Sequence, residues 1–177
     1  MTRLETERLM LRPWLKTDAE DLYRYASDPE SGPIAGFPVH TSIENSLEII
    51  DTVFQESGNF AIYLKSENRV VGSISLKIGQ QSSLDLTNQE AEIGYWIGKP
   101  FWGQGLMPEA VEAVIDYALN TLELTDLWCA YYEGNVKSQR VQEKCGFRYH
   151  HTAYDVPVPL MHDVRTVHVM YYVGGEK

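Results

Sequence analysis

Apolar positions along the chain fall into short alternating runs and longer helical stripes, a combination typical of a mixed α/β protein. Residues Leu9–Arg12 alternate as a short strand does, and Asn59–Leu64 and Arg69–Leu76 have the composition of a β-hairpin. Residues 90–97 and 127–132 indicate two further strands. The sheet is therefore expected to grow in chain order through its first part.

Four stretches have the spacing of helices that bury one face. The first begins at Thr17 or Asp18, either of which can cap it, and ends near Ala26. The second is expected over residues 43–56. The third follows the glycine turn at residues 103–105, with Pro108 in its first turn, and carries an apolar stripe from Val111 to Leu122; the fourth is expected over residues 135–144. The loop between the first two helices, Asp28–Thr41, carries three prolines and two glycines. Such a loop either walls a substrate pocket or crosses the surface, and we favour the first.

Two β-rich runs, Phe147–Thr152 and Val164–Val173, predict a closing hairpin whose connection, residues 155–162, contains two prolines. A chain of 177 residues can bury a proper core as one domain. We therefore expect residues 1–177 to form a single α/β domain. Its sheet should be mixed and mostly antiparallel, with about six to seven strands flanked by about four helices.

The charge of the chain narrows the class of partner. Acidic residues number 25 and basic residues 15, so the formal net charge is -10. A protein with this net charge is not attracted overall to the negative phosphate backbone of a nucleic acid, so we expect no nucleic-acid partner. An acidic surface favours a cationic acceptor such as an amine, although solubility alone explains the same charge.

Cysteine and histidine usage argues against a metal site. Cys129 and Cys145 are the only cysteines, and they have neither disulfide-framework nor zinc spacing. Of the five histidines only His40, in the long loop, stands where a site is expected. No apolar run approaches the roughly 20 residues of a membrane span, and the N-terminus is charged from Arg3 onward. We expect no metal, no membrane partner and a cytoplasmic protein.

The stretch from Glu90 to Met107 reads as a strand, a glycine-rich turn and the start of a helix. Glycines at 103 and 105 let backbone approach a ligand, and the helix presents free N–H groups and its positive dipole end. Such a junction suits a phosphate or pyrophosphate. The dinucleotide motif is excluded because Pro108 stands at its third small position, and the P-loop is excluded because no Gly-Lys-Ser or Gly-Lys-Thr follows.

Four segments, in order, carry a resemblance to a known family: Leu4–Arg12, Pro100–Gly105, Asn135–Ser138 and Glu143–Phe147. Over nearly the whole chain the sequence resembles the GNAT superfamily of N-acetyltransferases, in particular the branch of ribosomal-protein N-terminal (alanine or serine) acetyltransferases. The resemblance implies a sheet splayed at its centre. It also implies acetyl-CoA as co-substrate, wedged where the fourth and fifth strands diverge, with an acceptor amine entering from the opposite side.

The resemblance further implies which residues hold acetyl-CoA. Backbone groups of the glycine turn would bind the pyrophosphate, although Pro100 stands where the family has Gln or Arg. The end of the central strand would pair with the pantetheine arm and polarise the thioester carbonyl. Asn135 would hold the pantetheine amide, cap its own helix, or do both. The implied cofactor-binding residues are Tyr95, Trp96, Ile97, Trp102, Gly103, Gln104, Gly105, Leu106, Met107, Asn135 and Ser138.

Acetyl transfer needs a neutral amine, yet a lysine-type amine has a pKa of about 10.4 and a chain N-terminus one of about 7.7 to 8.0. A partly desolvated carboxylate can remove that proton, directly or through a water. Strand alternation places Glu90, Glu92 and Gly94 on one face, and Gly94 fits a bulge. Glu92 resembles the general base of some family members. The alternative is that both glutamates are charged residues of a solvated strand start.

Many family members meet the departing thiolate with a tyrosine at the position that here is Gln142, and an amide has no proton to give at a useful pKa. Ser138 resembles the serine that this branch places near the sulfur, although it can equally cap its own helix. We therefore expect direct attack by the amine of a protein N-terminus or small molecule, with Glu92 and Ser138 as catalytic residues. The alternative is a catalytically weak CoA-binding regulatory or interaction module. A homodimer is left open.

Overall fold

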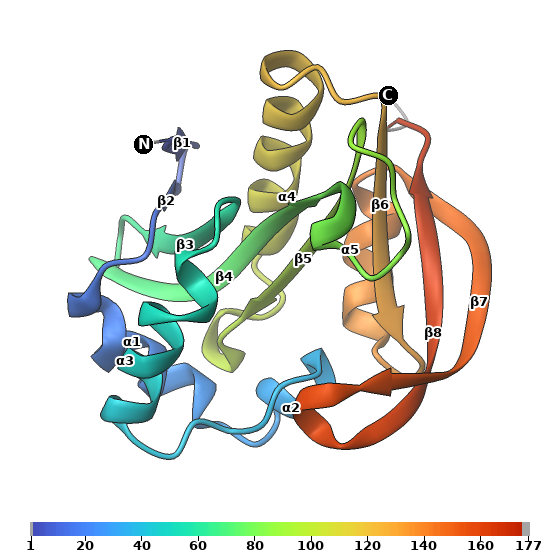
Figure 1. Ribbon diagram of the computed structural model, residues 1–177. Helices are drawn as coiled ribbons and strands as arrows, with labels where there is room; N and C mark the ends of the chain where they lie inside the picture. Colours follow the sequence, from blue (N-terminus) through green and yellow to red (C-terminus); the bar gives the residue numbers. More distant parts are fainter. Residues whose placement is uncertain (1, 175–177) are drawn as a thin grey trace.

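The computed structural model describes residues 2–174, which form one eight-stranded sheet with helices on both faces (Figure 1). The strand order is β1-β2-β3-β4-β5-β6-β8-β7, and neighbours are antiparallel except for β5 and β6. The strands are β1 (Leu4–Glu5), β2 (Leu9–Arg12), β3 (Asn59–Leu64), β4 (Arg69–Ile78), β5 (Glu90–Ile97), β6 (Asp126–Tyr132), β7 (Phe147–Val158) and β8 (Asp163–Tyr172). The mixed α/β class is confirmed, with slightly more strands than predicted.

Residues 2–174 contain five α-helices: α1 (Ala19–Ala26), α2 (Gly32–Ala35), α3 (Ile43–Asp51), α4 (Leu106–Asp116) and α5 (Val136–Lys144). Ile62 and Val71 lie in the larger core with α4, whereas their chain neighbours Ala61 and Val70 lie in a smaller core with α1 and α3. Successive strand residues point to opposite faces, so α4 covers one face and α1 and α3 the other (Figure 1). None of these described helices has the length and apolar character that a membrane span requires.

Short elements account for most departures from the sequence pattern. The strand β1 was not predicted, because two residues are too few to show an alternation. The helix expected over residues 43–56 ends at Asp51 and is followed by a single 3₁₀ turn, Val53–Gln55. The long loop before α3 contains the four-residue helix α2. These differences leave the order of the predicted elements unchanged.

The closing hairpin differs more from the sequence prediction. The connection expected over residues 155–162 is wrong. Strand β7 continues to Val158 through a register shift between Ala153 and Val156, with Asp155 at a φ of 51°. Pro157 pairs with Val164 inside the ladder. This is tolerated because β7 is the last strand of the sheet. A proline in an edge strand can face solvent with the side that lacks an N–H group, so no hydrogen bond of the ladder is lost.

The centre of the sheet opens between β5 and β6. The two strands pair in parallel over only three positions, from Glu90 with Asp126 to Glu92 with Trp128, and then diverge. The bulge expected at Gly94 is wrong, since the pairing of β4 with β5 runs without a shift through that residue. The predicted central splay is confirmed. It lies between the fifth and sixth strands because β1 adds one strand at the edge.

A buried ion pair ties β2 to the start of α1. Arg12 donates through Nη1 and Nη2 to the two carboxylate oxygens of Asp18 at 2.8 and 2.9 Å, and the Leu15 N–H donates to the same carboxylate at 2.8 Å. Asp18 is the N-cap residue of α1, one of the two predicted candidates, but its side chain makes no capping hydrogen bond to that helix. The hydrogen bond to Asp18 is the main cause that raises the pKa of Arg12. The side chains are 12% and 7% exposed.

We expect Asp18→Asn to lower the free energy of unfolding by about 3 kcal/mol, because it leaves a buried guanidinium without its counter-charge. Glu20→Gln is the matched control, since the ion pair of Glu20 with Arg24 is exposed and 3.9 Å long. That substitution should change stability by no more than about 0.5 kcal/mol. Urea denaturation measures both, and equal losses in the two variants would contradict the assignment.

Candidate active site

The turn after β5 has the local geometry of an anion cradle. Gly103 and Gly105 both lie in the left-handed region, with φ of 76° and 75°, and Gly105 is the N-cap of α4. A Cβ built on Gly103 would meet no heavy atom within 4 Å. None of the backbone hydrogen bonds found for residues 2–174 uses the N–H of Gly103, Gln104 or Gly105. Three neighbouring donors at a helix N-terminus are thus free for an anion.

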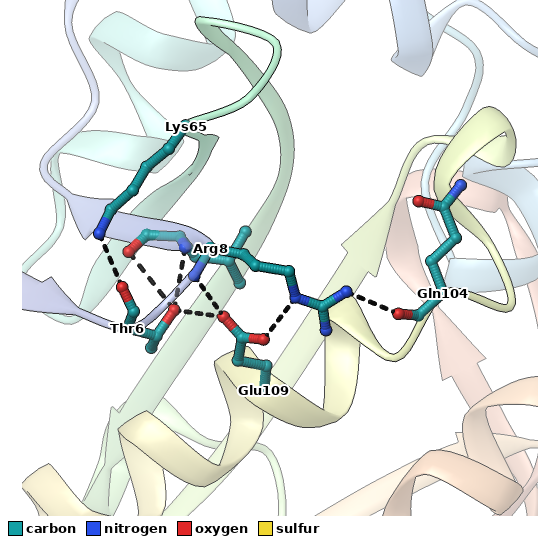
Figure 2. A network of polar contacts seen from close by, with 6 residues as sticks. Thr6, Arg8, Lys65, Gln104 and Glu109 are labelled. Carbon is teal, nitrogen blue, oxygen red and sulfur yellow. Dashed lines mark hydrogen bonds and ion pairs between the residues drawn. The ribbon is translucent and has the colours of Figure 1, made fainter.

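A polar network fastens this turn to the N-terminal hairpin (Figure 2). Arg8 donates through Nη1 to the Gln104 carbonyl at 2.9 Å and through Nε to Glu109 at 2.8 Å. Thr6 donates to Glu109 at 2.5 Å, and Lys65 donates to the Thr6 carbonyl at 2.7 Å. Burial raises the pKa of Glu109, but the hydrogen bonds from Thr6 and Arg8 outweigh it and lower the pKa below its ordinary value. Because Glu109 belongs to the first turn of α4, the network positions the cradle on the sheet.

Trp102 joins the cradle to β5 and α5. Its indole N–H donates to the Ile97 carbonyl at 2.9 Å, and Lys137 of α5 places its Nζ 3.6 Å from the ring centroid. Leu106 and Met107 are buried in the core, so only their backbone can face a ligand. The cofactor-binding residues predicted for this turn are thereby brought together at one end of the gap between β5 and β6.

The end of β5 offers an unpaired backbone edge. Pairing with β6 stops at Glu92, so the side of Tyr95–Ile97 that faces the gap is not taken by a neighbouring strand. The Trp96 side chain turns away and packs against Phe37, with ring centroids 5.3 Å apart. The carbonyl of Ile97 already accepts the Trp102 indole. At the end of β5, the groups that can pair with an extended ligand are therefore backbone N–H and C=O groups.

Glu92 presents a free carboxylate oxygen, whereas Glu90 does not. Glu92 accepts a hydrogen bond on Oε1 from Ser82 at 2.8 Å, and its Oε2 has no hydrogen-bond partner within residues 2–174. Glu90 accepts on Oε2 from the Trp128 indole at 2.8 Å and on Oε1 from Thr87 at 3.1 Å. Of the two acidic residues on this face, Glu92 is the one able to accept a proton without breaking an existing contact.

Tyr95 lies on the opposite face of β5, beside the first turn of α5. Its hydroxyl is 3.0 Å from both the carbonyl oxygen and the Oγ of Ser138. Gln142 donates through Nε2 to Ser138 Oγ at 3.1 Å and to the Ala130 carbonyl at 3.0 Å. Burial raises the pKa of Tyr95, so the phenol stays protonated at neutral pH. The cap of α5 is Asn135, whose Oδ1 accepts the Ser138 N–H at 3.3 Å.

Two contacts of the candidate site residues were not predicted from the sequence. Ser82 lies in a polar loop whose serines look alike in sequence, and only the folded loop brings one of them to Glu92. Tyr95 was expected to act through its backbone alone. Its alternation with Ala91 and Ile93 was a usable signal, because it places the ring on the buried face that looks toward α4 and α5.

The long loop before α3 closes over the end of β6. Arg165 of β8 donates to the Pro33 carbonyl at 2.7 Å and stands 4.8 Å from the Tyr132 ring centroid. A Cβ on Gly36 would come within 2.8 Å of that ring. His40 fixes the far end of the loop, with Nδ1 2.8 Å from Ser46 Oγ of α3. The loop is therefore held against the C-terminal strands, and His40 is an anchor rather than a site.

Burial lowers the pKa of His40 below its ordinary 6.5. The unfolded chain then takes up a proton at a higher pH than the folded chain, so stability falls as the pH falls through 6.5 toward the folded-state pKa. We expect His40→Gln to flatten the pH dependence of the unfolding free energy between about pH 7 and 5. Denaturant titrations at several pH values measure this, with the exposed His151→Gln as control. A His40→Gln variant with the wild-type slope would contradict the assignment.

Comparisons with known proteins agree with this geometry. Residues 8–148 match the family model described as acetyltransferase (GNAT) domain. The N-acetyltransferase p20 of Bacillus licheniformis, itself uncharacterized, is 29% identical over 153 residues, which cover 84% of this chain and 83% of p20.

Two solved structures share the fold. The ribosomal-protein-S5-alanine acetyltransferase of Vibrio fischeri has a TM-score of 0.72 and 19% identity, over 98% of this chain and 97% of its own. The microcin C7 self-immunity acetyltransferase MccE, solved with acetyl-CoA and AMP, has a TM-score of 0.76 and 20% identity, over 95% and 93%. A ribosomal-protein acetyltransferase is thus among the proteins that share this fold. The family match spans most of the sequence, and the chain belongs to the GNAT acetyltransferase family as an N-acetyltransferase.

Proposed function

We propose that this protein transfers the acetyl group of acetyl-CoA to a primary amine by direct attack. The observation that carries the proposal is the pair of unlike groups on the two faces of β5. Glu92 has a free carboxylate oxygen on one face, and the hydroxyls of Tyr95 and Ser138 meet on the other. A proton acceptor for the amine and a hydrogen-bond donor for the leaving sulfur, Ser138, thereby lie on opposite faces of one strand, which suits attack by the amine on a thioester placed between them.

The residues present fit acetyl-CoA. Open space over Gly103 and the free N–H groups of the cradle suit the pyrophosphate. The unpaired edge of β5 suits the amides of the pantetheine arm, and Asn135 lies across the gap at the start of α5. When bound, acetyl-CoA supplies an acetyl group activated as a thioester.

The amine side depends on Glu92. Ser82 holds Oε1 of this carboxylate, which leaves Oε2 for the proton of the acceptor ammonium. A carboxylate in this position gives a neutral amine at a pH where most of the free amine is protonated. This is the role in which we place Glu92.

Direct attack is favoured over an acetyl-enzyme because no activated thiol is at hand. Cys129 and Cys145 are both buried. Burial raises the pKa of Cys129 well above its ordinary value and that of Cys145 to about 12. The thiolate is the nucleophile in cysteine chemistry, and neither residue supplies one at neutral pH.

The acceptor is proposed to be the N-terminal amine of a protein, with a small-molecule amine as the alternative. Likeness to an acetyltransferase named for ribosomal protein S5 favours the first, and the net charge of -10 suits either cation. We place the protein in the cytoplasm, where two unpaired cysteines stay reduced, and treat residues 1–177 as one domain.

The test is release of CoA thiol from acetyl-CoA in the presence of a panel of amines. The panel holds peptides beginning with alanine or serine, the same peptides blocked at the N-terminus, polyamines and aminoglycosides. We expect release only with unblocked peptides. Release with the small amines alone would show that the acceptor is a small-molecule amine and not a protein N-terminus. CoA binding without turnover on any amine would favour the regulatory module instead.

A further inference from the structure

We propose that Gln142 is a positioning residue, which fixes the Ser138 hydroxyl as a hydrogen-bond donor to the departing thiolate of CoA. The inference rests on the proposed function, because it concerns the sulfur that leaves during acetyl transfer. It goes beyond that function by giving a role to the glutamine that stands where many family members carry a tyrosine.

The direction of the hydrogen bonds follows from the Ala130 carbonyl. A carbonyl oxygen only accepts, so the Gln142 atom 3.0 Å away has to be the amide nitrogen. The same nitrogen lies 3.1 Å from Ser138 Oγ and donates its second hydrogen there. Ser138 is therefore an acceptor toward Gln142, and its own hydrogen is left to be donated elsewhere.

Tyr95 completes the arrangement from β5. Its single hydroxyl hydrogen has two acceptors at 3.0 Å, the carbonyl oxygen and the Oγ of Ser138. Within residues 2–174, the Ser138 hydrogen has no acceptor other than the phenol oxygen. An anionic sulfur is a stronger acceptor than a neutral phenol, so a thiolate in the gap would draw the Ser138 hydrogen to itself.

A second observation concerns the other end of the amide. Gln142 is 1% exposed, and its Oε1 has no hydrogen-bond partner among the described residues. Burying an unpaired amide oxygen costs stability, which an apolar side chain of similar size would avoid. Because an apolar side chain would fill this space at lower cost, we expect the amide nitrogen of Gln142 to have a role in the site.

The role is a hydrogen bond and not a transfer of the serine proton. A serine hydroxyl is a far weaker acid than a thiol, whose pKa is about 8.5, so moving its proton to sulfur would be uphill. As the amine nitrogen bonds to the acetyl carbon, the carbon–sulfur bond breaks and its electron pair stays on sulfur. The nitrogen loses two protons, one from the ammonium before attack and one after the bond to the acetyl carbon has formed. Glu92 takes them in turn and passes them to solvent, and solvent protonates the released thiolate.

The test is the pKa of the CoA thiol in the complex of the protein with CoA, read from thiolate absorbance in the near ultraviolet against the protein alone. We expect the wild type to lower this pKa by about one unit, the effect of one charge-assisted hydrogen bond. Ser138→Ala and Gln142→Met should each return it to the value of free CoA. Gln139→Met on the same helix is the matched control and should keep the wild-type value.

A thiol pKa that Gln142→Met leaves unchanged, in a variant that still binds CoA, would overturn the inference. Should that variant not fold, Gln142→Glu keeps the shape and replaces the donor by an acceptor, so it should raise the thiol pKa above the wild-type value, and a wild-type value would overturn the inference equally. Absence of CoA binding by the wild type would instead overturn the proposed function.

Discussion

Replacing Glu92 with glutamine is expected to lower kcat for acetyl transfer by about 10²- to 10⁴-fold, the range for loss of a general base. The amide can still accept the Ser82 hydrogen bond through its oxygen, so the strand and its loop keep their contacts. What is lost is the ability to take a proton from the acceptor. The deficit should therefore shrink as the pH rises toward the pKa of the acceptor amine, because more of the amine is then neutral without help.

Glu90→Gln is the matched control for this result. Glu90 lies on the same strand face, but its oxygens are occupied by Trp128 and Thr87. We expect a change in kcat of less than about fivefold for this variant, since both carboxylate oxygens of Glu90 already accept hydrogen bonds and neither is free to take the proton of the acceptor. Rates of CoA release at saturating acetyl-CoA, measured across pH, compare the two. Equal losses, or a Glu92→Gln variant as fast as the wild type, would contradict the assignment of the base.

Valine at Gly103 is expected to weaken acetyl-CoA binding by about 100-fold, which corresponds to the loss of one or two hydrogen bonds to a charged group. The backbone there has a φ of 76°, which a β-branched residue avoids, so the turn must change conformation. Its free N–H groups then no longer converge. The new side chain also projects into the open space over the cradle.

The control for Gly103→Val is Gly174→Val. Gly174 has a φ of 101° and equally open space, but it lies outside the site, in the last residues that the structure describes. Calorimetric titration with acetyl-CoA measures the affinities, and thermal unfolding without ligand checks that both variants fold. Wild-type affinity in Gly103→Val would mean that the pyrophosphate does not bind at this turn.

Much of the fold follows from local pattern. The alternation along Glu90–Ile97 and the glycine turn after it predict a strand and a helix whose junction the structure reproduces. The extension of β7 past Pro157 could not be predicted, because it depends on β7 being an edge strand. Gly94 misled for a related reason. The splay arises where the pairing of β5 with β6 stops. The residues of a strand do not show which other strand pairs with it or where that pairing ends.

The candidate site divides in the same way. Glu92 stands in an alternating strand and Asn135 at a helix start, so their positions could be predicted locally, whereas the roles expected of them came from the resemblance to the family. The contacts that refine their roles are tertiary. Arg8 reaches Glu109 across 101 positions of sequence, and no spacing relates the two. The direction of the hydrogen bond from Gln142 to Ser138 depends on the Ala130 carbonyl, which accepts from the same amide nitrogen and is 12 positions away in the sequence.

The central claim is direct transfer of acetyl from acetyl-CoA to an amine, and mass spectrometry of both protein and acceptor tests it most directly. The protein is incubated with acetyl-CoA, first alone and then with an unblocked alanine- or serine-terminated peptide. We expect no acetylated protein in the first case, and in the second one acetylated peptide for each CoA released. Acetyl carried on the protein before the acceptor is added, and lost when it is added, would contradict the account.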